Sequence, residues 1–146
     1  MPDLALSEDA AVVLALAGTA IPFSHSAESE AEHWLRILRM HGEVGHAMQA
    51  LGVGERPLEG GRVPREATQR FRRGGENVVD LVTARAVDLA KGRSARAVAT
   101  VDVFEAVRAI YGSFFDDVLY SHGASAEELE ERLAHAPEEG TPAASC

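Results

Sequence analysis

The chain has 146 residues, 46% of them hydrophobic, which is enough for one domain with an apolar core. Its 23 acidic and 14 basic side chains give a net charge of -9, which would repel nucleic acid. The longest apolar run, within residues 10–21, is shorter than the roughly 20 residues of a membrane helix. The N-terminus is acidic, unlike a secretory or transit signal. We therefore expect a cytoplasmic protein without nucleic-acid or membrane partners.

The first half of the chain predicts three helices. The first begins after Ser7, a suitable N-cap followed by two acidic residues, and ends at Gly18 and Pro22. The second covers residues 30–41, where apolar side chains recur at helical spacing. The third covers residues 43–51 and ends at Gly52, where a left-handed C-cap is expected.

The second half predicts four more helices. A connector of Gly, Pro, Arg and Glu, with a possible short basic helix at 65–73, separates it from the first half. The predicted helices cover residues 76–92, 101–112, 113–125 and 125–134, the last with Ser125 as its N-cap. Ser125 and Glu128 form a capping-box pattern at the start of the last helix. No segment alternates with a period of two, so we predict no sheet.

The two halves align as an internal repeat. Each keeps the order helix, glycine, helix, glycine after a preceding helix and loop. The paired positions are Glu32 with Asp102, Trp34 with Phe104, Ile37 with Val107, Met40 with Ile110, Met48 with Leu119 and Gly52 with Gly123. We expect an all-α fold in which two pseudo-twofold-related repeats pack as one compact bundle.

These repeats define the expected domain organisation. A single domain covers residues 1–136, and residues 137–146 form a flexible tail. Within the domain, repeat 1 covers about 6–53, the connector about 54–75 and repeat 2 about 76–134.

Three segments of the first repeat, LALAGTAI, EHWLRIL and MQALGV, resemble the N-terminal domain of the Clp ATPases, the two-repeat helical module in front of their AAA+ rings. The resemblance covers about residues 6–133 and implies a substrate-receptor module. It also implies partners among peptides, adaptors, Clp protease components and their substrates. No GxxxxGK[ST] motif is present, so we expect no ATPase activity.

The resemblance singles out Glu32 and Asp102 as candidate binding residues. In the Clp family the glutamate at this position helps to receive positively charged groups such as modified arginines. Carboxylates bind guanidinium groups through two parallel hydrogen bonds, although the helix dipole alone also favours acidic residues in a first turn. The family pattern is not kept throughout: Ala31 replaces its threonine, Asp102 and Val103 replace its Glu-His pair, and Pro22 shortens the first helix.

Two Glu-x-x-His pairs suggest an alternative function. Glu30 with His33, and Glu43 with His46, have the spacing that carboxylate-bridged metal proteins use inside helical bundles. Such centres need further glutamates from other helices, which this sequence does not offer in obvious positions.

The remaining histidines, serines and arginines do not form a recognisable catalytic or metal-binding motif. The histidines lack zinc spacing with cysteines, and no GxSxG elbow is present. The cluster Arg62, Arg65, Arg70, Arg72 and Arg73 is expected to pair with acidic termini or stay solvated.

We therefore predict a non-catalytic module that binds a peptide, adaptor or small molecule, with no catalytic residue, metal or cofactor. It would regulate a Clp protease or compete with one. The alternatives are a metal-binding protein or enzyme that uses the Glu-x-x-His pairs, and a structural dimerisation module.

Overall fold

The computed structural model describes residues 4–23, 26–55 and 77–135. This part of the chain forms seven α-helices and one short 3₁₀ turn, and it contains no strand, which confirms the all-α prediction. The elements are α1 (Glu8–Ala20), η1 (Ile21–Phe23), α2 (Ala27–Arg39), α3 (Gly42–Ala50), α5 (Val78–Gly92), α6 (Thr100–Tyr111), α7 (Ser113–His122) and α8 (Ala126–Ala134). The predicted basic helix, the Arg62–Arg73 cluster and the tail lie outside the described residues.

The starts of α1 and α8 follow the predicted capping chemistry. The Ser7 hydroxyl accepts a hydrogen bond from the Ala10 N–H at 3.1 Å. At α8, Ser125 and Glu128 each accept from the other's backbone N–H, at 3.1 and 2.8 Å. These bonds satisfy N–H groups that have no partner within a helix. The capping box predicted at Ser125 is confirmed.

Of the two residues predicted to end the first helix, Pro22 is confirmed and Gly18 was wrong. The helix α1 continues through Gly18 to Ala20, and Pro22 lies in the 3₁₀ turn that follows. A glycine inside an exposed helix costs only about 1 kcal/mol, which the neighbouring buried residues offset. Proline has no N–H to donate to the carbonyl four residues earlier, so α-helical bonding stops before it.

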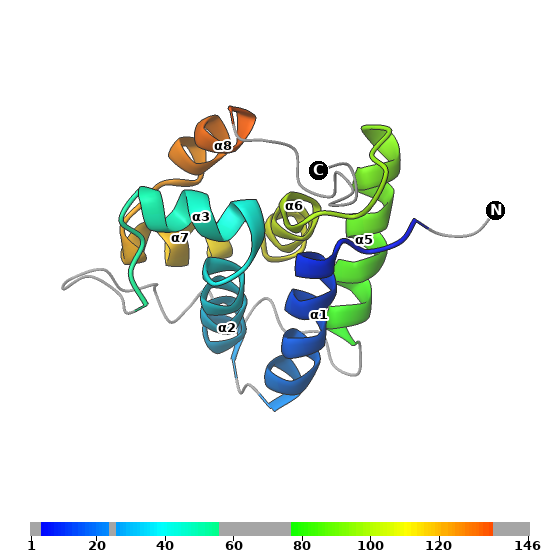
Figure 1. The fold of residues 1–146 in the computed structure, drawn as a ribbon. Coiled ribbons are helices and arrows are strands. Elements are labelled where there is room, and N and C mark those ends of the chain that lie inside the picture. The colour runs from blue at the N-terminus through cyan, green and yellow to red at the C-terminus, as the bar shows by residue number, and fades with distance from the viewer. Residues whose placement is uncertain (1–3, 24–25, 56–76, 136–146) are drawn as a thin grey trace.

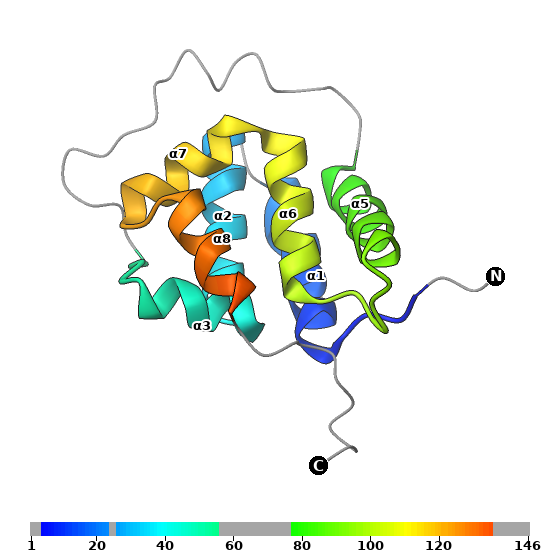
Figure 2. The ribbon, with the colours of Figure 1, turned by 90° about the horizontal axis from the view of Figure 1, so that it is seen from above.

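The helices pack around α2 and α6 (Figures 1 and 2). In the first half α1 and α3 contact α2, and in the second half α5 and α7 contact α6. The halves also contact each other reciprocally, because α3 packs on α6 and α7 packs on α2. The last helix, α8, lies across α3 and α7, on the opposite side of α6 from α5.

The aromatic pair predicted from the repeat lies in the core. Trp34 and Phe104 have no exposed surface, which confirms both as buried anchors. The Trp34 indole N–H donates to the Tyr111 hydroxyl at 3.1 Å, and that hydroxyl donates to the Glu30 carboxylate at 2.7 Å. The Phe104 ring meets Phe115 edge-on, with centroids 6.0 Å apart. The hydrogen bonds of Tyr111 join α2 and α6, and the aromatic contact joins α6 and α7.

The C-terminal ends of α3 and α7 meet at two glycines. Gly52 has a φ of +88°, the left-handed conformation predicted for it. A Cβ atom at Gly123, where φ is +129°, would lie 3.0 Å from the Gly52 carbonyl oxygen. The Gly54 N–H then donates to the His122 carbonyl at 3.1 Å. The backbones of the two halves can approach this closely because Gly123 carries no side chain.

Within the described ranges, no helix has both the length and the apolar composition needed to cross a membrane.

Candidate functional site

Glu32 lies at the interface between the two halves. Its side chain is 19% exposed, and its carboxylate contacts Nε2 of His122, which belongs to α7 and is fully buried. The other ring nitrogen, Nδ1, lies 2.9 Å from the Gly54 carbonyl oxygen. Glu32 therefore already has a partner within the protein, and it links α2 to α7.

Asp102 is more completely enclosed. Its side chain is 3% exposed, and both of its oxygens accept hydrogen bonds from the Arg93 guanidinium, at 2.8 and 2.7 Å. One oxygen also accepts from the Ala99 N–H at 2.9 Å. The carboxylate thus caps α6 and ties it to the end of α5, which leaves little of it for a ligand.

The two Glu-x-x-His pairs lie in different surroundings and do not share one site. The Glu30 carboxylate accepts from Tyr111 in the core, and His33 Nδ1 lies 3.2 Å from the Ser29 carbonyl oxygen on its own helix. Glu43 and His46 lie on α3 and line a surface groove instead. No group of three or more His, Cys, Asp or Glu side chains is placed to hold a metal ion in the described segments.

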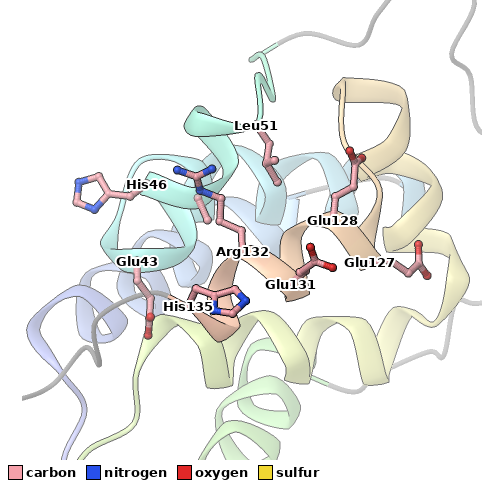
Figure 3. Close-up of a pocket in the computed structure, with 9 residues that line it drawn as sticks. Glu43, His46, Leu51, Glu127, Glu128, Glu131, Arg132 and His135 are labelled. Atoms are coloured by element: carbon pink, nitrogen blue, oxygen red, sulfur yellow. The ribbon is translucent and has the colours of Figure 1, made fainter.

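The groove runs between α3 and α8 (Figure 3) and has a volume of about 730 Å³. It follows both helices along eight residue steps, or roughly 12 Å at 1.5 Å per residue. Ala47 and Leu51, one turn apart on α3, provide its aliphatic surface. The other lining residues are Glu43, His46, Glu127, Glu128, Glu131, Arg132 and His135.

Negative charge dominates the groove. It is lined by four carboxylates and a single guanidinium, that of Arg132, which extends from α8 toward α3 (Figure 3). Glu127 and Glu131 are exposed and lie one turn apart on α8. Glu128 is held in place by the Ser125 N–H. The α8 side of the groove therefore presents three carboxylates, and the α3 side presents the aliphatic side chains of Ala47 and Leu51.

Arg108 anchors the α8 wall to the rest of the bundle. Its guanidinium makes two hydrogen bonds to Asp116 of α7, at 2.8 and 3.1 Å, and contacts Glu130 of α8 and Glu105. Burial, with the adjacent Glu130 carboxyl, raises the pKa of Glu105 from its usual 4.5 to about 7. Asp116 beside it raises the pKa of Arg108, so this guanidinium stays charged. The network fixes where α8 lies relative to α6 and α7.

Sequence reasoning missed this groove. It singled out Glu43 and His46 as a metal pair, and it considered Glu128 only as a capping residue. The available signal was the acidic face of the last helix, where Glu127 and Glu131 share one side. That face became a groove wall only when α8 packed next to α3.

Comparisons with known proteins do not assign a family: no family model, curated protein or solved structure matches the chain.

Proposed function

We propose that this protein is a non-catalytic module that binds a peptide or a segment of another protein in the groove between α3 and α8. The groove itself carries the proposal. It combines a concave shape, an aliphatic strip for apolar side chains and charged groups along its wall, the features that orient peptide ligands between helices.

The position of the groove's polar side chains favours binding over catalysis. Glu127, Glu131, Arg132, His46 and His135 are all exposed to solvent. Acid-base and nucleophilic groups work best where water is excluded and neighbouring groups tune their reactivity. A binding surface has no such requirement.

We also propose that the two halves are repeats of the kind found in Clp N-terminal domains. Their reciprocal packing supports this: α3 contacts α6 as α7 contacts α2. The aligned glycines, Gly52 and Gly123, lie against each other, and the aligned Trp34 and Phe104 are both fully buried. A role as a receptor module that regulates a Clp protease, or competes with one, follows from this likeness.

An affinity experiment tests the function. The folded protein is used as bait in native cytosol, beside a variant with Glu127→Lys and Glu131→Lys, and the captured proteins are quantified by mass spectrometry. We expect specific proteins to be captured by the natural chain and lost with the variant. Equal capture by both baits would contradict a role for the groove. Specific capture without Clp subunits or degradation substrates would contradict the Clp role but not binding.

A further inference from the structure

We propose that the ligand of the α3–α8 groove is a basic amphipathic protein segment, one in which lysine or arginine side chains flank an apolar side chain. This inference rests on the proposed function and specifies the chemistry of the partner. It concerns the groove and not Glu32 or Asp102, whose carboxylates are occupied within the protein.

The dimensions of the groove indicate a short segment. Its length of roughly 12 Å corresponds to about four residues in extended conformation or about two turns of helix. A volume of about 730 Å³ holds a few side chains but no folded domain. Ala47 and Leu51 together offer contact for about one apolar side chain, since they lie one turn apart on the same helix.

The charges decide which segment fits. Four carboxylates line the groove against one guanidinium, so an acidic segment would be repelled. Glu127 and Glu131 lie one helical turn apart, about 5–6 Å between Cβ atoms. Basic side chains on either side of an apolar residue would meet these carboxylates while the apolar residue contacts Leu51. Because the carboxylates are exposed, their main effects should be selectivity and a strong dependence on salt.

Three fluorescein-labelled 12-residue peptides test the inference by fluorescence anisotropy. The first repeats Leu-Arg-Ala, the second replaces each leucine with serine, and the third replaces each arginine with glutamate. We expect the first to bind, the second to bind at least fivefold more weakly and the third not to bind. Raising the NaCl concentration from 50 to 300 mM should lower the affinity of the first peptide at least tenfold.

Matched variants locate the binding. The double variant with Glu127→Gln and Glu131→Gln should bind the first peptide about tenfold more weakly. Asp80→Asn with Asp88→Asn removes the same charge from exposed positions on α5, across the molecule, and should change affinity less than twofold. Leu51→Ser should weaken binding of the leucine peptide to the level of the serine peptide. Circular dichroism melts of each variant establish that it is folded.

Each outcome has a defined meaning. Tighter binding of the glutamate peptide, or equal effects of the α8 and α5 variants, would overturn the basic-segment assignment while leaving a binding function possible. A dimer that the Glu127 and Glu131 substitutions abolish, seen by analytical ultracentrifugation, would make a second copy the occupant and also overturn it. If none of the three peptides binds and the bait captures nothing, the proposed function itself fails.

Discussion

Removing the Glu32 side chain should destabilise the fold, because it leaves a buried nitrogen without a partner. His122 has no exposed surface, and its Nδ1 lies 2.9 Å from the Gly54 carbonyl oxygen. A carbonyl oxygen only accepts, so Nδ1 carries a proton and donates. Nε2 faces the Glu32 carboxylate, and a hydrogen bond between them needs a proton on one of the two groups. Glu32 and His122 therefore join the two halves through a contact between their side chains.

The size of the effect depends on what replaces the carboxylate. In Glu32→Ala, Nε2 loses its partner inside the protein, which should cost about 1 to 3 kcal/mol of unfolding free energy. In Glu32→Gln, the amide can donate to Nε2 of a neutral ring while Nδ1 still donates to Gly54, so the loss should stay below about 1 kcal/mol. The two substitutions thus separate the hydrogen bond from the charge.

Urea denaturation at pH 7, followed by far-UV circular dichroism, measures both free energies. The double-mutant cycle of Glu32→Ala with His122→Phe should give a coupling of about 1 kcal/mol or more, because the two side chains touch. If Glu32→Gln is as damaging as alanine, the contact requires the carboxylate itself and not only a hydrogen-bond partner. If Glu32→Ala lies within about 0.5 kcal/mol of the natural chain, the contact does not stabilise the fold. Glu32 would then again be available as a ligand-binding carboxylate.

Three further predictions concern the core, the interface between the halves, and Glu105 in the Arg108 network. Trp34→Ala should lower the unfolding free energy by about 3 to 5 kcal/mol in chemical denaturation; a loss under 1 kcal/mol would contradict its burial. Gly123→Ala should cost about 1 to 3 kcal/mol in thermal melts, because its φ is +129° and the new Cβ would lie 3.0 Å from the Gly52 carbonyl oxygen; Gly92→Ala, in open space within a helix, should cost nothing. The pKa of Glu105 is raised to about 7 from 4.5, so the folded state binds the extra proton and stability should fall as pH rises between these values. Glu105→Gln should make this decline of the unfolding free energy smaller by about 1 kcal/mol, a figure already reduced for solvent screening. If the dependence of stability on pH is the same in the variant, the raised pKa is contradicted.

Much of the fold could be predicted from local sequence. The helix starts at Ser7 and Ser125 follow from side chains that accept hydrogen bonds from nearby backbone N–H groups. Gly52 ends α3 in the predicted left-handed conformation. Pro22 ends α1 as predicted, but Gly18 does not, because a glycine weakens a helix without stopping it and packing of the buried side chains around it favours continuation.

The candidate site could be predicted only in part. Glu32 and Asp102 were identified as carboxylates in first turns, but their partners, His122 and Arg93, come from other helices. Whether such a carboxylate faces solvent or another side chain depends on how the helices pack. At Asp102 the sequence signal is the same in both cases, since the helix dipole favours an acidic residue in the first turn of α6. Glu32 lies beyond the first turn of α2, which begins at Ala27 and not at the predicted residue 30.

The sequence by itself determined the all-helical class, the starts of α1 and α8, and the burial of Trp34 and Phe104. These features depend on hydrogen bonds within a few residues and on apolar periodicity. Only the tertiary structure decided that α8 lies beside α3 and encloses a groove, and that His122 meets Glu32 across 90 positions of the chain. Both depend on contacts between residues far apart in sequence. A local pattern records which face of a helix is apolar but not which helix covers it.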